Sequence, residues 1–458
     1  MIFKTFPNEA SGCIAYLLGC QKAGVAVVVD PGRADLDAYA DEARARGLAL
    51  THVIDTHIHA DHVSGNRELA ARTGAALCLH EAADVRFAHV GLQDGERLRL
   101  GSVEVRVLHT PGHTPESVSL VVLDTSRGPE PWFVLTGDTL FVGDVGRPDF
   151  GGETAAATLH RSLFGRLLPL GDAVEVYPAH GAGSACGRAM SAKLGSTIGF
   201  ERRFNPALRH ADPEAFVRAL MEGLPSRPAN MDQVIARNKG VVMVKRPTPE
   251  RFQPGDLAAR LAAGATLVDI RDPRAFGAAH VAASLNVWID GPQFAERLSW
   301  FAPPDRPLIL LAEREGEVAR ALAGLARIGL DEVAGFVIGP GAVRAAGLPV
   351  AELPNVTAPE LARRLASERD LLVVDVREPS EWEKGHVPGA RHLPMRQVPD
   401  RLEELPRDRP IALICRGGPR SSLVGSLLLA RGFTRLVNVW GGMTGWMEAA
   451  LPVAENQD

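Results

Sequence analysis

Short apolar runs bounded by turn residues alternate with amphipathic segments along the first half of the chain. Residues 25–30 (VAVVVD) and 51–57 (THVIDTH) have the composition of buried strands. Between them, residues 36–48 (LDAYADEARARGL) carry apolar positions at helical spacing, so we expect a helix there. The alternation continues to about residue 245 and predicts a domain built from both strands and helices.

The second half of the chain contains an internal repeat. Residues 267–287 (LVDIRDPRAFGAAHVAASLNV) align with residues 373–394 (VVDVREPSEWEKGHVPGARHLP), and both keep the order strand, helix, strand. A repeat unit of roughly 100 residues is longer than solenoid repeats, so it predicts a duplicated domain with a parallel α/β sheet. Pro and charged residues at 245–256 predict a linker before the first copy. We therefore expect three domains, with the boundaries 1–248, 249–353 and 354–458.

Composition narrows the classes of protein to consider. The 458 residues include 50 Lys and Arg and 55 Asp and Glu, and the net charge of -5 argues against nucleic-acid or anionic-membrane partners. The first 30 residues lack the features of a signal peptide, and no apolar run reaches the roughly 18 residues that span a bilayer. We expect a cytoplasmic protein. The cysteines are scattered without CxxC pairs, which does not predict a disulfide framework: Cys13, Cys20, Cys78, Cys186 and Cys415.

Histidines and carboxylates gather directly after the predicted strand at residues 51–55. His57, His59, Asp61 and His62 lie within six positions, and such crowding is costly unless a cation compensates it. Further candidates follow in loops rich in Gly or Pro, where the backbone bends around a site: His113 in TPGHTPES, Asp138 in LTGDTLF and His180 in YPAHG. These seven residues predict a metal centre.

The motifs HIHADH, GHT, GD and AHG, in this order, resemble those of the metallo-β-lactamase superfamily. The resemblance implies an αββα sandwich with the metal site along one edge of the sheets. With the repeat included, the expected fold class is α/β: an αββα sandwich followed by two parallel α/β domains.

Two arrangements of metal are open within this superfamily. In a binuclear centre of the glyoxalase II kind, two zinc ions would be held by His57, His59 and His113, by Asp61, His62 and His180, and by a bridging Asp138. In the persulfide dioxygenase branch, one Fe(II) is bound by His57, His113 and Asp138 alone. The other four residues would then orient those ligands and manage protons.

Residues 145–150 (VGRPDF) favour the persulfide dioxygenase branch, because they resemble its GR-x-DF signature. The resemblance implies that Arg147 and Asp149 hold the active-site loop and the polar end of the substrate; the alternative is a local structural ion pair. The GHTPES segment, with Glu116 and Ser117, resembles bacterial fusion dioxygenases and leaves the preferred thiol open. Residues 226–238 (SRPANMDQVIARN) are expected to line the substrate.

The last copy of the repeat carries a candidate nucleophile. Cys415 follows an apolar strand and heads a Gly-rich turn into a helix, where backbone N–H groups favour a thiolate and bind anions. Arg416 and Arg420 add positive charge suited to an oxyanion such as thiosulfate or sulfite. The segment CRGGPR, with its flanking motifs, resembles the active loop of the rhodanese sulfurtransferases.

The middle copy lacks this chemistry. Ala312 stands in place of Cys415 and Glu317 in place of Arg420, so we expect an inactive rhodanese-like domain that serves as a spacer or a dimerisation element. An Asp, an Arg and a His nevertheless recur in both copies, so we expect them to fix loops and turns: Asp269 and Asp375, Arg271 and Arg377, His280 and His386.

These features predict a bifunctional enzyme. One Fe(II) per chain would oxidise a thiol persulfide of glutathione or coenzyme A type with O₂ to sulfite, and Cys415 would transfer sulfur to or from thiosulfate and sulfite. The alternatives are a two-zinc thioester hydrolase with an appended rhodanese domain, and a binding module with a vestigial metal site. The last requires a degraded ligand set, and none of the seven positions is degraded. We also expect a homo-oligomer.

Overall fold

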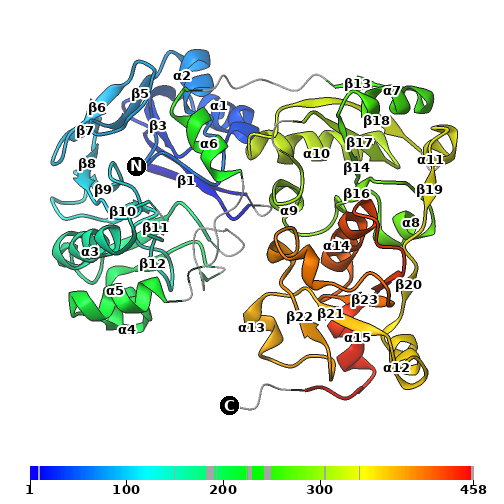
Figure 1. The fold of residues 1–458 in the computed structure, drawn as a ribbon. Helices are drawn as coiled ribbons and strands as arrows, with labels where there is room; N and C mark the ends of the chain where they lie inside the picture. The colour runs from blue at the N-terminus through cyan, green and yellow to red at the C-terminus, as the bar shows by residue number, and fades with distance from the viewer. Residues whose placement is uncertain are drawn as a thin grey trace. The chain divides into compact units, whose positions relative to one another are not determined.

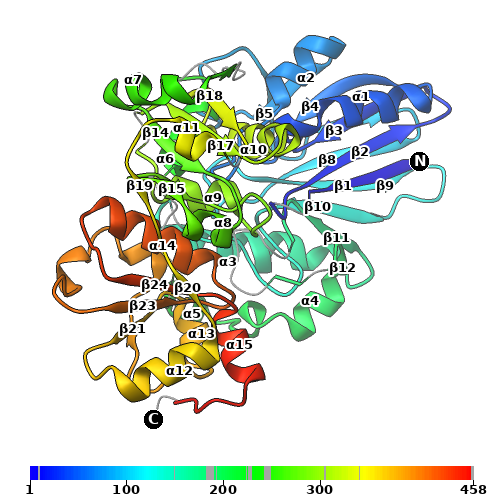
Figure 2. The same cartoon turned by 90° about the vertical axis from the view of Figure 1, so that its right-hand side faces the viewer.

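The computed structural model contains two compact units, which Figures 1 and 2 show from two sides. Unit 1 comprises Met1–Val244 with Ala326–Gly329, and unit 2 comprises Lys245–Leu325 with Leu330–Asp458. The structure describes residues 1–454 except 9–10, 149, 182–189, 192, 223, 225–229, 242–248, 304–305 and 340. In this described part of the chain, no helix has the length and apolar character that crossing a membrane requires.

Unit 1 is built around two sheets of six strands each. The first contains, in spatial order, β1 (Ile2–Pro7), β2 (Ile14–Cys20), β3 (Val25–Val29), β4 (Ala49–Ile54), β5 (Ala76–His80) and β6 (Val90–Leu92). The second contains β12 (Ser196–Thr197), β11 (Glu175–Pro178), β10 (Phe133–Gly137), β9 (Val118–Asp124), β8 (Val103–His109) and β7 (Arg97–Leu100). The strands and the helix predicted at residues 25–57 are confirmed as β3, α1 and β4.

Helices cover the outer face of each sheet of unit 1. They are α1 (Leu36–Ala45), α2 (Asn66–Thr73), α3 (Gly152–Ser162), α4 (Ile198–Phe204), α5 (Pro213–Met221) and α6 (Met231–Asn238). The alternation of side chains along β2 explains the layers: Tyr16 and Leu18 enter the core shared by the two sheets, whereas Leu17 packs with Tyr39 of α1 on the other face. Leu159 of α3 belongs to a third core, against the second sheet. The predicted αββα sandwich is confirmed.

Unit 2 contains two parallel sheets with the same strand order. In the middle copy the order is β13 (Glu250–Arg251), β18 (Val333–Ile338), β17 (Leu308–Ala312), β14 (Thr266–Asp269) and β16 (Leu285–Asn286). In the last copy it is β20 (Asn355–Val356), β24 (Leu436–Val439), β23 (Ile411–Ile414), β21 (Leu372–Asp375) and β22 (Arg391–His392). Equal order in both sheets agrees with a duplicated domain.

Helices flank both sheets of unit 2. Those of the middle copy are α7 (Leu257–Ala262), α8 (Pro273–Ala278), α9 (Phe294–Ser299), α10 (Glu315–Arg327) and α11 (Ala342–Ala345). Those of the last copy are α12 (Ala358–Ser367), α13 (Pro379–Trp382), α14 (Pro419–Ala430) and α15 (Gly442–Glu448). In the middle copy, β15 (His280–Val281) and β19 (Val350–Ala351) form a separate short antiparallel pair.

The residues that recur in both copies are structural. The Asp375 carboxylate and the Arg377 guanidinium form a buried ion pair at 2.7 Å, and Arg377 also donates to the carbonyl of Gly385 at 2.8 Å. The His386 ring stacks on Trp382 with centroids 3.4 Å apart. The middle copy repeats this pattern with Asp269 and Arg271 at 2.6 Å, and with His280 stacked on Phe276 at 3.8 Å. The ion pair and the stack therefore hold the turn after the second strand of each copy, as expected.

Replacing Asp375 with Ala should destabilise the last copy strongly. The substitution leaves the Arg377 charge buried without its carboxylate, which costs about 3–5 kcal/mol. Hydrogen–deuterium exchange should show faster exchange in β21 and β23, while Asp370→Ala, at an exposed position near the same sheet, should leave exchange unchanged. Equal exchange in the two variants would contradict a structural role for the ion pair.

Candidate metal centre and cysteine loop

The seven predicted metal-centre residues come together at the ends of four strands of unit 1. The segment between β4 and α2 carries His57, His59, Asp61 and His62. The loops after β8, β10 and β11 carry His113, Asp138 and His180. Six of these side chains are buried, and the Asp61 side chain, at 10% exposure, is the most accessible. The strand ends therefore deliver a dense cluster of nitrogen and oxygen donors to one place.

His57, His113 and Asp138 form the first group in this cluster. Their potential ligand atoms lie within 4.8 Å of one another. The Oδ2 atom of Asp138 is 3.8 Å from His57 Nε2 and 3.6 Å from His113 Nε2, and this buried oxygen has no hydrogen-bond partner among the described residues. The other ring nitrogens are engaged, with His57 Nδ1 3.0 Å from Thr56 Oγ1 and His113 Nδ1 2.9 Å from the Arg147 carbonyl. Two imidazoles and a carboxylate so oriented fit a divalent metal ion.

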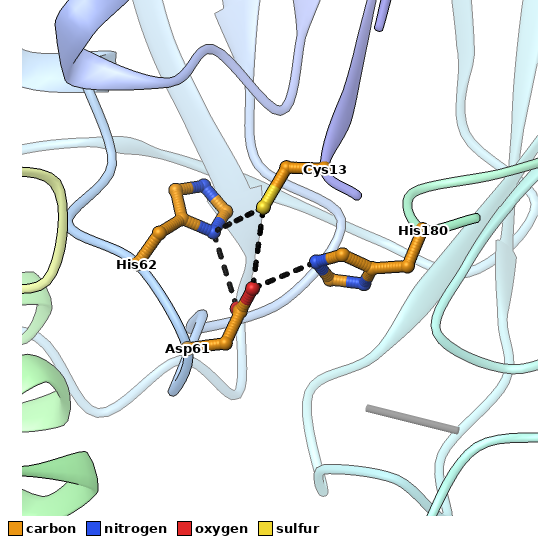
Figure 3. Close-up of side chains that lie close together, drawn as sticks. All are labelled: Cys13, Asp61, His62 and His180. Carbon is orange, nitrogen blue, oxygen red and sulfur yellow. Dashed lines mark hydrogen bonds and ion pairs between the residues drawn. The ribbon is translucent and has the colours of Figure 1, made fainter. Parts of the chain in front are cut away.

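Cys13, Asp61, His62 and His180 form a second group (Figure 3). The Asp61 Oδ2 atom accepts hydrogen bonds from Cys13 Sγ at 3.3 Å and His180 Nε2 at 2.9 Å, while its Oδ1 lies 3.1 Å from His62 Nδ1. His180 Nδ1 lies 2.6 Å from Oδ1 of Asp138 and so joins this group to the first. Both carboxylate oxygens of Asp61 and both ring nitrogens of His180 are thus occupied by neighbouring side chains.

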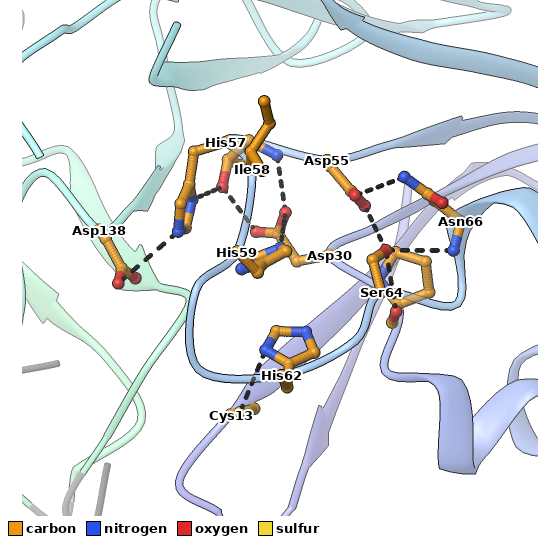
Figure 4. A network of polar contacts seen from close by, with 12 residues as sticks. Cys13, Asp30, Asp55, His57, Ile58, His59, His62, Ser64, Asn66 and Asp138 are labelled. Carbon is orange, nitrogen blue, oxygen red and sulfur yellow. Dashed lines mark hydrogen bonds and ion pairs between the residues drawn. The ribbon is translucent and has the colours of Figure 1, made fainter. Parts of the chain in front are cut away.

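His59 belongs to a third group, with Asp30 and Asp55 (Figure 4). Its Nε2 atom lies 3.3 Å from Asp30 Oδ1, and Asp30 also accepts from the backbone N–H and the hydroxyl of Thr56 at 2.7 and 3.0 Å. Asp30 directly follows β3. Its φ of 52° lies in the left-handed region, which Asp tolerates better than most residues. Among the described residues, His59 Nδ1 and His62 Nε2 have no hydrogen-bond partner.

Electrostatics in the cluster suit metal binding. Burial, reinforced by the neighbouring His59, lowers the pKa of His57 well below its ordinary value; burial and His62 do the same to the pKa of His59. Both rings are therefore neutral, which is the form that binds metals. Burial opposes ionisation of Asp138, but His180 and His57 outweigh it and hold the pKa of Asp138 below its ordinary value. Neutral imidazoles beside a carboxylate supply nitrogen and oxygen ligand atoms for a metal ion, together with one negative charge.

Sequence reasoning missed the residues that hold the loop of the metal centre. Asn238, at the end of α6, donates to the carbonyls of His59 and His62, each at 2.8 Å, and accepts from the Ser64 N–H at 2.9 Å. Glu116 accepts from the Ile58 N–H at 2.9 Å. We expected the segment 226–238 to line the substrate; part of it lies outside the described residues, and its last residue instead braces this loop. No local sequence pattern predicts such a contact, because Asn238 and His62 are far apart in the sequence.

The segment around Arg147 lies against the metal-centre residues. Arg147 is buried, and its carbonyl orients His113. A Cβ atom on Gly146 would lie 1.9 Å from the Asp138 carbonyl oxygen, so only glycine allows this close approach. Asp149 lies outside the described residues, and the proposed roles of Arg147 and Asp149 at the substrate stay a prediction.

Cys415 lies between β23 and α14 in the last copy. It is buried, and its Sγ accepts hydrogen bonds from the Gly418 N–H at 3.0 Å and the Ser421 hydroxyl at 3.4 Å. These donors belong to the first turn of α14, where the helix dipole also favours a negative charge. The Met443 N–H donates to the Cys415 carbonyl at 2.8 Å and so links the loop to α15. The local structure suits a nucleophilic sulfur.

The two arginines of the cysteine loop have different surroundings, and their roles toward an oxyanion stay a prediction. Arg420 does not offer a free cation, because its guanidinium donates to both carboxylate oxygens of Glu381, at 2.6 and 2.8 Å. Glu381 comes from α13, a contact that the loop sequence alone does not reveal. Arg416 is exposed. Arg420 is therefore a bridge between the loop and α13, with its charge largely neutralised by Glu381.

Comparisons with known proteins agree with the geometry. Residues 10–180 match the family model of the metallo-beta-lactamase superfamily. The chain is 33% identical over 242 residues to a hydroxyacylglutathione hydrolase of Polaromonas sp., covering 47% of this chain and 88% of that protein. The chain belongs to the metallo-β-lactamase superfamily. Within it, the human mitochondrial persulfide dioxygenase ETHE1 is 29% identical over 231 residues, covering 50% of this chain and 85% of that protein.

A solved metallo-β-lactamase structure from Staphylococcus aureus subsp. aureus COL is similar beyond the metallo-β-lactamase domain. It superimposes with a TM-score of 0.66 at 30% identity, over 74% of this chain and 98% of that chain. Residues 357–449 match the rhodanese-like domain model. These matches confirm the predicted resemblance to a metallo-β-lactamase domain of the persulfide dioxygenase kind fused to a rhodanese-like domain.

In the middle copy, a side chain occupies the backbone N–H groups of the loop that corresponds to the cysteine loop. Glu317 Oε2 accepts from the backbone N–H groups of Glu313 and Arg314, at 3.0 and 3.2 Å. In the last copy, the equivalent turn directs a backbone N–H at the Cys415 sulfur instead. A buried carboxylate therefore occupies the position where an anion would bind, and Ala312 provides no nucleophile.

Replacing Asn238 with Ala should weaken metal binding by the metallo-β-lactamase domain. The change removes three hydrogen bonds to the loop that carries His57, His59 and His62. Loss of such supporting contacts lowers metal affinity by about 10- to 100-fold. Competition with a chelator, followed by elemental analysis, measures the effect. Asp232→Ala, on the exposed face of the same helix, is the control, and equal metal retention in both variants would contradict the bracing role.

Proposed function

We propose that the metallo-β-lactamase domain oxidises a low-molecular-weight thiol persulfide with O₂ to sulfite and the free thiol. In this proposal one Fe(II) per chain is held by His57, His113 and Asp138. We further propose that the rhodanese-like domain transfers sulfane sulfur through Cys415. The relatives support a role in sulfur metabolism, since one is named as a persulfide dioxygenase and the last domain is rhodanese-like. We expect the thiol to be of glutathione or coenzyme A type.

The observation that carries the proposal is the division of the donor cluster. Asp138 Oδ2 and the two Nε2 atoms of His57 and His113 face one point, while Asp61 and His180 are engaged with each other. Two imidazoles and one carboxylate leave other coordination positions open, which is the pattern of Fe(II) oxygenases. A ferrous ion held there would supply the one-electron chemistry that lets O₂ react with the persulfide sulfur.

The surrounding residues orient the ligands and accept protons. Thr56 and the Arg147 carbonyl fix the outer nitrogens of His57 and His113, so that the Nε2 atoms point inward. The balanced reaction, in which R–SSH, O₂ and H₂O give R–SH and sulfite, releases two protons. The hydrogen bonds from Asp138 through His180 to Asp61 offer a path for a proton away from the centre.

Cys415 would act by two displacements. Its thiolate attacks the outer sulfur of a donor such as thiosulfate, the bond between the two donor sulfurs breaks, and sulfite leaves with the electron pair. The resulting persulfide on Cys415 then passes its outer sulfur to an acceptor thiolate or sulfite. The N–H of Gly418 and the hydroxyl of Ser421 stabilise the sulfur anion before attack and after release. Sulfite is common to both proposed reactions, which gives the fusion a chemical reason.

A second candidate is a binuclear thioester hydrolase. It is supported by the 33% identical hydroxyacylglutathione hydrolase and by the buried His59 Nδ1 and His62 Nε2 atoms, which have no partner among the described residues. Two zinc ions would use these nitrogens. Asp61 and His180 would then have to give up hydrogen bonds to one another, and for that reason we favour the single-ion centre.

Metal content and O₂ uptake together test the main proposal. Protein purified without added metal should contain about one iron per chain, and it should consume O₂ and release sulfite with glutathione persulfide or coenzyme A persulfide. The measurements are elemental analysis and an oxygen electrode. Two zinc ions per chain, together with hydrolysis of S-lactoylglutathione and no O₂ uptake, would favour the thioester hydrolase instead.

Two reciprocal variants separate the proposed activities. His113→Ala removes one of three ligands, so O₂ uptake and bound metal should fall to background while sulfur transfer from thiosulfate stays within about twofold. Cys415→Ser removes the nucleophile, so sulfur transfer should fall by at least about 1000-fold with O₂ uptake retained. Each variant is the control for the other. Loss of both activities in the properly folded Cys415→Ser variant would show that the two sites are not separate.

A further inference from the structure

The inactive rhodanese-like copy contacts the helix that carries the cysteine loop. At the end of β16, the Asn286 Oδ1 atom accepts a hydrogen bond from the Ser422 hydroxyl at 2.6 Å, and the Asn286 N–H donates to the Ser426 hydroxyl oxygen at 2.9 Å. All three residues are buried. Asn286 also donates to the carbonyls of Asp269 and Arg271, both at 3.1 Å, so it links the middle sheet to α14 (Figure 1).

A second contact reaches the cysteine loop itself. Trp440 follows β24, and its ring lies so close to Gly418 that a Cβ atom there would be 2.8 Å away. Two residues of the inactive copy pack on this ring: the Trp288 centroid is 6.4 Å distant, and the Arg274 guanidinium carbon is 4.8 Å from the ring centroid. The inactive copy therefore supports the turn that donates to Cys415.

The residue that follows helix α9 of the inactive copy is linked to the start of α13 in the last copy. The Trp300 ring, directly after α9, stacks under the Arg396 guanidinium at 5.0 Å, and Arg396 is 3.5 Å from a carboxylate oxygen of Glu378. Glu378 caps α13, the helix that supplies Glu381 to Arg420. These contacts link the end of α9, through Arg396, to the start of the helix that carries Glu381.

Arg297 on α9 is the cation that this arrangement brings to the site. Arg297 is partly buried, and its guanidinium has no hydrogen bond or ion pair with the residues that the structure describes. Burial, followed by the positive charge of Arg420, lowers the pKa of Arg297 to about 10, whereas the charge of Cys415 acts in the opposite direction. Arg297 therefore remains charged at neutral pH and interacts with both Arg420 and Cys415. The carboxylates of Glu296 and Glu381 also act on Arg297, but neither forms a direct ion pair with it in the described structure, in contrast to the Glu381–Arg420 pair.

We propose that the inactive copy completes the sulfurtransferase site, with Arg297 binding the oxyanion end of the sulfur donor. This rests on the proposed sulfur transfer by Cys415. The ligand class is a small sulfur oxyanion, namely thiosulfate as donor and sulfite as leaving group. When the Cys415 thiolate takes the outer sulfur of thiosulfate, the electron pair of the broken sulfur–sulfur bond leaves with sulfite. Arg297 stabilises that dianion with charge-assisted hydrogen bonds. The duplicated domain thus has a role in substrate binding although it has no nucleophile.

The test compares two sulfur donors in the full-length protein. Arg297→Gln should lower kcat/KM for thiosulfate by about 10- to 100-fold, as expected for the loss of a charge-assisted hydrogen bond, mainly through KM. With glutathione persulfide, whose transferred sulfur carries no sulfonate, kcat/KM should change by less than about threefold. Arg297→Lys keeps the charge and should restore part of the thiosulfate activity. Arg344→Gln, an exposed position on α11 of the same copy, is the matched control.

A binding measurement makes the result independent of turnover. In the Cys415→Ser background, calorimetric titration with thiosulfate should give a dissociation constant at least about tenfold higher when Arg297 is Gln. Unchanged thiosulfate binding, or an equal loss of activity with both donors, would overturn the role of Arg297. Absence of sulfur transfer in the unsubstituted protein would overturn the proposed function instead, and the titration would still decide whether Arg297 binds the oxyanion.

Discussion

Imidazole and carboxylate groups that are removed from water must find partners, and this requirement governs the first unit. Four strand ends deliver histidines and aspartates to one buried place, where each added charge raises the cost of burying the next. Hydrogen bonds among Asp61, His180 and Asp138 meet part of the requirement. The remaining inward-facing atoms, above all Asp138 Oδ2, have no protein partner in the described structure. A cation at this point would satisfy them.

The same requirement explains the residues outside the ligand set. Asp30 adopts a left-handed conformation and accepts hydrogen bonds from Thr56, which in turn contacts His57. Burial, together with the nearby Asp30 carboxylate, raises the pKa of Asp55 to about 8, so this group is largely protonated at neutral pH and brings little further negative charge. These residues hold the loop before any metal arrives. Rigid placement of the ligands lowers the free-energy cost of binding an ion.

The two copies in unit 2 share the same strand order but differ in the loop that carries Cys415 in the last copy. The buried Asp–Arg pair and the stacked His recur because the turn they hold is needed in both copies. The loop after β17 differs from the loop after β23. In the middle copy a buried carboxylate, Glu317, accepts from the backbone N–H groups of this loop, whereas in the last copy the corresponding turn donates to the Cys415 sulfur. The residues that hold the frame of each copy are therefore separate from the residues that differ between the two loops.

The sequence by itself determined the element types, the repeat, the αββα class and the seven metal-centre candidates. The element types and the repeat follow from periodicity and internal similarity, and the metal-centre candidates follow from short motifs, all of which can be read along the chain. The αββα class is what the resemblance of those motifs to the metallo-β-lactamase superfamily implies. The tertiary structure decided which donors face a common point, how Asp30 and Asn238 support them, and that Glu381 neutralises Arg420. It also brought Trp288 and Arg274 of the middle copy against Trp440, beside the cysteine loop of the last copy. These partners are separated by tens to hundreds of residues, and only the packing of strands and helices makes them neighbours.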